Sequence, residues 1–211
     1  VLAISEKGNL FNAPETYMNK IATGKIDKGL IDLDHSLEKN IKNLSDFKNK
    51  DISSLTVCIL DRPRHKKIID ELKDLDVNVK LISDGDVLGA IYVSDPKYNV
   101  DMFLGIGGGP EGVISAAALD TYDCHFQGRF IFDNEDDINV AKSMGIKDLN
   151  KKYDLSEIVK GDSIFSATGI TSSDILNGIK FDKDNYISET LITHKNSKFK
   201  EIIKNINPIN E

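Results

Sequence analysis

The stretch Val100–Leu119, which reads VDMFLGIGGGPEGVISAAAL, decides the fold. It begins with the apolar run Val100–Leu104, whose composition predicts a buried β-strand. The glycine-rich segment Gly105–Gly112 follows and predicts a turn, because glycine adopts the backbone conformations that tight turns require. Pro110 is suited to the first position of a helix, so Pro110–Leu119 is predicted to be helical. Strand, turn and helix in this order form the βα unit from which α/β folds are built.

The alternation of strands and helices continues on both sides of this stretch. Residues 1–33 predict irregular structure after one short strand, and the polar segment after Lys195 predicts a frayed tail. Because alternating strands and helices are typical of βαβ units, we expect an α/β fold with a mostly parallel sheet flanked by helices. The other strands are predicted at Ser54–Leu60, Val77–Ser83, Phe126–Phe132, Ser163–Ala167 and Tyr186–Thr193, and helices at residues 34–50, 66–75 and 136–144.

Composition limits the class of protein. The 211 residues carry a net charge of −7, which argues against broad nucleic-acid binding because such binding needs a basic face. No apolar stretch approaches the roughly 20 residues of a membrane-spanning helix, and no signal peptide is recognisable. The two cysteines, Cys58 and Cys124, form no Cys-x-x-Cys motif and do not indicate an oxidising compartment. We therefore expect a cytoplasmic protein with neither a membrane nor a nucleic acid as partner.

Four segments place Asp, Arg, Thr or Gly directly after a predicted strand. They are residues 61–65, 84–86, 105–112 and 168–169. In open α/β sheets, ligands bind beyond the carboxyl ends of the strands. We therefore expect the four segments to converge on one edge of the sheet and to form the functional site.

The first of these segments carries two arginines around a proline. Pro63 fixes its own backbone and favours an extended conformation at Arg62. The planar guanidinium groups of Arg62 and Arg64 match phosphate oxygens in a bidentate manner, so we expect them to bind phosphate rather than only face solvent. His65 is predicted to be a surface residue at the start of a helix.

The second segment, Asp84-Gly85-Asp86, allows two interpretations. It could be a turn followed by a helix in which Asp86 serves as the N-cap. Alternatively, the carboxylates of Asp84 and Asp86 could accept hydrogen bonds from sugar hydroxyls. The residues alone do not decide between the two.

The glycine turn also has two explanations. Gly107-x-Gly109-x-x-Gly112 matches the fingerprint of a dinucleotide-binding fold, and Asp133 supplies the acid that this fingerprint requires. However, a carboxylate at Glu111 would compete with a pyrophosphate for the N-terminus of the helix. Glu111 could instead bind Mg²⁺ or Mn²⁺, which prefer carboxylate oxygens, or it could simply complement the helix dipole.

Taken together, the motifs resemble those of the class II fructose-1,6-bisphosphatases of the GlpX type. They occur in the order of that family along almost the whole chain. The matching segments are Ala13–Met18 (APETYM), Ile31–Asp34 (IDLD), Leu60–His65 (LDRPRH), Asp84–Val87 (DGDV), Gly105–Gly112 (GIGGGPEG), Ala116–Leu119 (AAAL), Gln127–Arg129 (QGR), Ala167–Thr171 (ATGIT) and Glu189–Leu191 (ETL).

The resemblance implies a layered sugar-phosphatase-type fold and a metal-dependent hydrolysis. The reaction would remove the 1-phosphate of fructose 1,6-bisphosphate, a step of gluconeogenesis, and cyanobacterial-type members also accept sedoheptulose 1,7-bisphosphate. Glu111 would bind the metal, Mn²⁺ or Mg²⁺, and a homo-oligomer would form. The residues implied to contact the sugar bisphosphate are Tyr17, Arg62, Pro63, Arg64, Asp84, Gly85, Asp86 and Gly108.

The resemblance also implies a division of the chain. Residues 1–50 would be the remnant of an N-terminal α+β domain, residues 51–185 a C-terminal α/β domain, and residues 186–211 a last strand with a polar tail. The family's N-terminal part, with its other metal-binding acids, does not occur in this sequence, and the catalytic residues are expected there. Two alternatives stay open: a fragment that binds sugar phosphates without catalysis, and a dinucleotide-binding domain.

Overall fold

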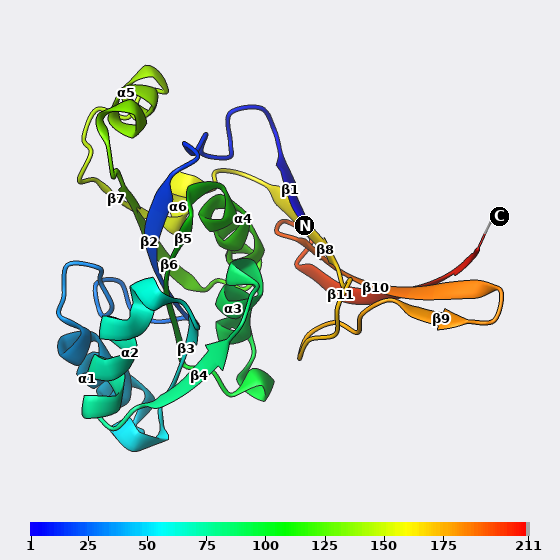
Figure 1. Cartoon of the computed structure of the whole chain (residues 1–211), viewed down its shortest axis with the longest axis horizontal. Helices are drawn as coiled ribbons and strands as arrows, with labels where there is room; N and C mark the ends of the chain where they lie inside the picture. Colours follow the sequence, from blue (N-terminus) through cyan, green and yellow to red (C-terminus); the bar gives the residue numbers. More distant parts are fainter. Residues whose placement is uncertain (210–211) are drawn as a thin grey trace.

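A larger β-sheet forms the centre of the protein, which we describe from a computed structural model that defines residues 1–209 (Figure 1). Its six strands lie in the order β4-β3-β5-β2-β6-β7. Strands β3, β4 and β5 run parallel to one another, whereas β2 and β7 are antiparallel to their neighbours. The strands are β2 (Tyr17–Thr23), β3 (Thr56–Leu60), β4 (Asn78–Ile82), β5 (Met102–Gly108), β6 (His125–Ile131) and β7 (Lys152–Asp154).

Helices cover both faces of this sheet. Helices α1 (Leu37–Lys48) and α2 (Lys66–Asp74) bury one apolar cluster, whereas α3 (Asp86–Ile91) and α4 (Gly109–Asp120) bury a second one. Strand β3 contributes to both clusters because its side chains alternate between the two faces. The expected α/β class with helices flanking a sheet is thereby confirmed. Helices α5 (Glu135–Ser143) and α6 (Leu155–Ile158) follow β6 and β7.

The expectation of a mostly parallel sheet is wrong, because strand β2 had not been recognised. β2 lies between β5 and β6 and is antiparallel to both along all seven of its residues. Asn19 and Lys20 interrupt the apolar pattern of this segment, so the sequence predicted irregular structure there. In the structure Lys20 is fully buried among Met18 and Ala22, which share its face of the strand. The sheet is therefore mixed.

Strand β5 is longer than predicted and runs through most of the expected glycine turn. It extends to Gly108, and α4 begins directly at Gly109. Glycine is required in this strand because other side chains occupy the space of a Cβ atom; at Gly107 that atom would lie 2.4 Å from the Asp86 carboxylate. Pro110 stands in the first turn of α4, as predicted.

The smaller sheet contains most of the C-terminal segment. Its strands are β1 (Leu2–Ser5), β8 (Ser163–Thr168), β10 (Asn185–His194) and β11 (Phe199–Pro208), with β9 (Lys180–Asp182) paired to β10. β9, β10 and β11 project from the helical part of the molecule as an arm (Figure 1). The predicted fraying after Lys195 is wrong up to Pro208, because β11 pairs with all ten residues of β10. Residues 210 and 211 lie outside the described part of the chain.

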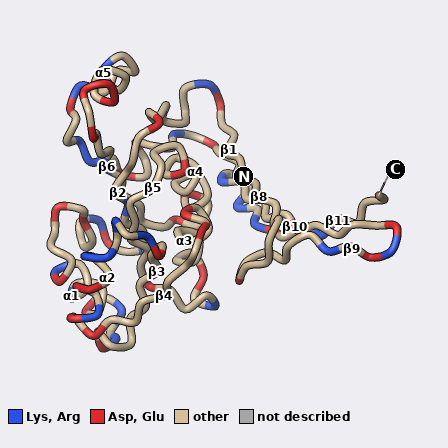
Figure 2. Tube along the Cα trace, in the orientation of Figure 1, with Lys and Arg blue, Asp and Glu red and all other residues tan. Residues whose placement is uncertain are grey.

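Acidic and basic residues are intermixed along α1, α2 and the outer end of the arm (Figure 2). This mixture agrees with the modest net charge of −7. Among residues 1–209, no helix combines the length and the apolar composition that crossing a bilayer requires.

Candidate active site

A cavity of about 540 Å³ opens where strands β3, β4, β5 and β8 end. Each of the four segments that were predicted to converge contributes residues to its wall. The fourth segment does so through Thr168 and Gly169. The polar and glycine residues that matter for its chemistry are Arg62, Arg64, Asp84, Asp86, Gly107, Gly108 and Glu111.

The arginines after β3 are fixed by their backbone and by their neighbours. Arg62 is extended, with φ −135° and ψ 145°, and Pro63 begins a short 3-10 turn. The Arg62 guanidinium lies 3.6 Å from a carboxylate oxygen of Asp84. Arg64 donates a hydrogen bond from Nε to the carbonyl oxygen of Ile106 at 2.7 Å, and its Cζ lies 5.1 Å from the centre of the Tyr17 ring. Both guanidinium groups are thus oriented at the cavity before any ligand arrives.

His65 is buried, so its predicted surface position is wrong. Its Nδ1 donates to the carbonyl oxygen of Leu60 at 2.7 Å, and its Nε2 accepts from the backbone N–H of Ile106 at 2.8 Å. The ring thereby ties the end of β3 to β5 and holds the two arginines beside the glycines. The residues next to His65 in the sequence, an apolar strand and a turn at Pro63, give no sign that its ring is buried between β3 and β5.

The Asp84–Asp86 segment turns sharply at the end of β4. Gly85 has φ 92°, a left-handed conformation that favours glycine. The Asp84 side chain is 92% exposed and faces Arg62. Asp86 does not cap α3, because its carboxylate instead pairs with the Lys20 ammonium group. The structure therefore does not show the N-cap that was one of the two interpretations.

Lys20 is the residue of this site that sequence reasoning missed. Its side chain has no exposed surface, and its ammonium group pairs with Asp86, which lines the cavity. Burial lowers the pKa of Lys20, and the nearby carboxylates of Asp86 and Glu111 oppose that shift only in part. The position of Lys20 between Met18 and Ala22 indicates a buried lysine only once the segment is known to be a strand, because only then do the three side chains share one face.

Glu111 lies in the first turn of α4 and is exposed at the cavity. Its carboxylate folds back over Gly108, where a Cβ atom would lie 1.9 Å from Glu111 Oε2. The glycine at position 108 therefore leaves the space that this carboxylate occupies. Within residues 1–209, no cluster of three or more His, Cys, Asp or Glu side chains is arranged to hold a metal ion. Glu111 fits a hard cation as a single ligand, to be joined by others.

Tyr17 lies at the rim, in a neighbouring pocket that shares Gly108 and Glu111 with the main cavity. Asp133, the acid of the dinucleotide fingerprint, lines the same neighbouring pocket. The cation–π contact between Tyr17 and Arg64 connects the two pockets.

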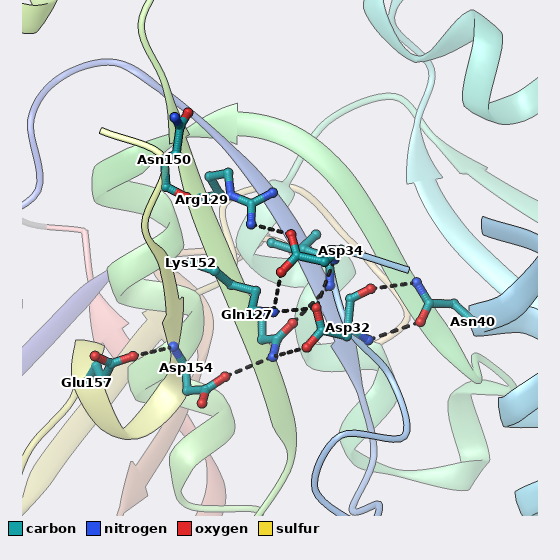
Figure 3. A network of polar contacts seen from close by, with 10 residues as sticks. Asp32, Asp34, Asn40, Gln127, Arg129, Asn150, Lys152, Asp154 and Glu157 are labelled. Carbon is teal, nitrogen blue, oxygen red and sulfur yellow. Dashed lines mark hydrogen bonds and ion pairs between the residues drawn. The ribbon is translucent and has the colours of Figure 1, made fainter. Parts of the chain in front are cut away.

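Two of the matching motifs lie away from this cavity and form a separate polar network (Figure 3). Asp34 accepts hydrogen bonds from Arg129 at 2.5 Å and from Lys152 at 2.7 Å, and Lys152 also pairs with Asp32. Gln127 accepts from the backbone N–H of Leu33 at 3.0 Å. The network fastens the loop after residue 30 to strands β6 and β7.

We expect the substitution Lys152→Met to lower the melting temperature Tm at neutral pH by about 2–4 °C, the effect of about 1 kcal/mol. Hydrogen bonds from Lys152 and Arg129 lower the pKa of Asp34 to about 2. An acid with a lowered pKa stabilises the fold above its unfolded pKa of about 3.9, and this stabilisation is lost as the pH falls toward 2. The difference in Tm between wild type and variant should therefore shrink below pH 4.

Thermal unfolding followed by circular dichroism between pH 7 and pH 2.5 measures this difference. Lys67→Met, at an exposed lysine of α2, is the control and should leave the profile unchanged. A Lys152→Met variant whose deficit in Tm persists unchanged at pH 2.5 would contradict the assignment to the carboxylates.

Comparison with known proteins identifies relatives over the whole described chain. A family profile described as bacterial fructose-1,6-bisphosphatase, glpX-encoded, matches residues 1–207. The protein named D-fructose 1,6-bisphosphatase class 2/sedoheptulose 1,7-bisphosphatase in Synechocystis sp. is 40% identical over 210 residues, which cover 93% of this chain and 61% of that protein.

Two further proteins of that name are similar to the chain. The one from Trichodesmium erythraeum is 37% identical and covers 100% of this chain and 65% of its own length. The one from Crocosphaera subtropica is 39% identical and covers 98% of this chain and 64% of its own length. The chain thus spans somewhat less than two thirds of the length of these relatives.

Proposed function

Because the chain belongs to the glpX-encoded bacterial fructose-1,6-bisphosphatases, we propose that the intact protein hydrolyses the 1-phosphate of fructose 1,6-bisphosphate. The products are fructose 6-phosphate and phosphate, and the reaction is a step of gluconeogenesis. The observation that carries this proposal is the single cavity that holds the arginines, the Asp84–Asp86 segment and Glu111 together. The two arginines suit a phosphate, and the aspartates suit a polyhydroxylated sugar.

Different residues of the cavity bind different parts of the substrate. Arg62 and Arg64 bind a phosphate group and offset its charge. Charge-assisted, bidentate hydrogen bonds between arginine and phosphate are among the strong ones in proteins. Asp84 and Asp86 accept hydrogen bonds from sugar hydroxyls. The absence of a Cβ atom at Gly108 leaves room for the Glu111 carboxylate beside the substrate, and Tyr17 stands at the rim next to Arg64.

Glu111 holds the divalent cation, Mn²⁺ or Mg²⁺, together with carboxylates outside residues 1–209. A cation held there would supply a Lewis acid for the phosphoryl oxygens and would lower the pKa of a bound water. Glu111 is placed for this role because its carboxylate lies over Gly108 at the mouth of the cavity. Residues 1–209 supply no cluster of further acidic ligands around Glu111, and they do not identify the general base.

The test is phosphate release by the intact protein from fructose 1,6-bisphosphate. We expect activity with Mn²⁺ or Mg²⁺ and its loss in EDTA, followed by recovery when the cation is restored. Activity with sedoheptulose 1,7-bisphosphate, the second substrate in the names of the relatives, is measured in the same assay. Absence of phosphate release under all of these conditions would overturn the proposal.

The same preparation separates the alternatives. A non-catalytic binder would be stabilised by fructose 1,6-bisphosphate in a thermal-shift measurement without releasing phosphate. A dinucleotide-binding domain would be stabilised by NAD and not by the sugar bisphosphate. A cytoplasmic location, a homo-oligomeric assembly and the division into domains stay predictions.

A further inference from the structure

We propose that Lys20 is a positioning residue, which holds one oxygen of Asp86 so that the other accepts a hydroxyl of the substrate sugar. This inference rests on the proposed function, because it concerns how the same cavity recognises the sugar. The residue lies on β2, outside all the segments that were predicted to form the site.

The two carboxylate oxygens of Asp86 differ in their surroundings. Oδ2 pairs with the Lys20 ammonium group, whose side chain is completely buried. Oδ1 is also buried, and it has no hydrogen-bond partner within residues 1–209. A buried acceptor without a donor is destabilising, so such atoms are rare in folded proteins. Asp86 lines the cavity, so a rotation of its carboxylate on substrate binding would offer Oδ1 to a ligand hydroxyl.

Three glycines provide the space for this pair. A Cβ atom at Gly107 would lie 2.4 Å from Asp86 Oδ2, and one at Gly105 would lie 3.5 Å from Oδ1. At Gly112 on α4, a Cβ atom would lie 3.2 Å from Cε of Lys20. Strand β5 and helix α4 thus leave room for one buried lysine and its partner, and this room defines the position of the carboxylate.

Charge explains why a lysine is suited to this position. Asp84, Asp86 and Glu111 all line the cavity, so an anionic bisphosphate would meet three carboxylates there. The Lys20 ammonium group offsets the charge of Asp86 through Oδ2 and leaves Oδ1 without a partner among residues 1–209. A buried ion pair contributes little net stability, whereas it fixes the geometry of its members.

The experiment is a double-mutant cycle in the intact protein, with Lys20→Met, Asp86→Asn and the double variant. We expect Lys20→Met to raise the KM for fructose 1,6-bisphosphate about tenfold or more, with a smaller change in kcat, because sugar binding is what it disturbs. In the Asp86→Asn background, Lys20→Met should change KM less than about twofold, because Lys20 acts only through Asp86. Lys152→Met, which removes a lysine between two other carboxylates, is the control and should leave KM unchanged.

The outcomes separate this inference from the proposed function. If wild type releases no phosphate, the proposed function fails. If wild type is active but Lys20→Met leaves KM unchanged, or if the effects of the two substitutions multiply, the inference about Lys20 alone fails. Should Lys20→Met not fold, a crystal structure of wild type with fructose 6-phosphate decides: a sugar hydroxyl on Asp86 Oδ1 with Lys20 on Oδ2 supports the inference, and any other arrangement of Asp86 overturns it.

Discussion

Replacement of Glu111 by alanine is expected to lower metal-dependent phosphate release by the intact protein about a thousandfold or more. Glu111 is exposed at the cavity, and its carboxylate lies over Gly108, so its removal takes away a ligand without disturbing the core. A metal that polarises a phosphoryl oxygen contributes several kcal/mol to the barrier, and each 1.4 kcal/mol corresponds to about tenfold in rate. The measurement is kcat/KM for fructose 1,6-bisphosphate at saturating Mn²⁺ or Mg²⁺.

A matched control separates metal binding from an effect on the helix. Glu135 occupies the corresponding first turn of α5, so Glu135→Ala removes the same kind of dipole-complementing charge away from the cavity. We expect this variant to keep its activity. Calorimetric titration with Mn²⁺ should show weaker binding to Glu111→Ala than to wild type. Unchanged activity and unchanged Mn²⁺ affinity in Glu111→Ala would sink the proposed role.

The second large effect is expected from Gly107→Ala, which should lower kcat/KM about a hundredfold. The added Cβ atom would lie 2.4 Å from Asp86 Oδ2 and 2.9 Å from its carboxyl carbon, so the carboxylate must move by close to 1 Å. A displacement of this size in a substrate-positioning group reduces catalysis by about two orders of magnitude. Asp86 is also the partner of Lys20, so the ion pair would be strained at the same time.

Gly105→Ala provides the comparison, because it lies on the same face of β5 two residues earlier. Its Cβ atom would meet the Phe103 ring at 3.2 Å and Asp86 Oδ1 at 3.5 Å, contacts that small adjustments can relieve. We expect less than about a tenfold loss of kcat/KM there. Circular dichroism should show that both variants are folded at the assay temperature. Equal effects of the two substitutions would argue against a specific clash with Asp86.

The strand-end segments could be predicted because each depends on local sequence. Arg62 to Arg64 follow a continuous apolar run, Asp84 to Asp86 follow the predicted strand Val77–Ser83, and the carboxyl ends of parallel strands meet at one edge. The βα unit around Gly108 was also correct in outline. These features need no knowledge of which distant segments lie beside them, so the sequence suffices.

The residues that were missed depend on contacts distant in the sequence. Lys20 and His65 are polar, and both are buried because groups from β5, α3 or β3 satisfy them. Their solvent exposure cannot be judged from neighbouring residues. The same holds for β11, which is polar and largely exposed, yet is held by its backbone ladder with β10. Burial and pairing in these cases follow from the tertiary arrangement, not from the hydrophobic pattern.

The central place of β2 also determines how this chain must fold. Ile21 pairs with Leu104 on one side and with Gln127 on the other, so both ladders join segments far apart in the sequence. Contacts between such distant segments close long loops. They slow folding, because the chain loses conformational entropy when the loop closes, before the strand pairing stabilises it. During synthesis, β2 leaves the ribosome before either of its neighbours exists. Lys20 therefore remains in water at least until β5, α3 and α4 have been made.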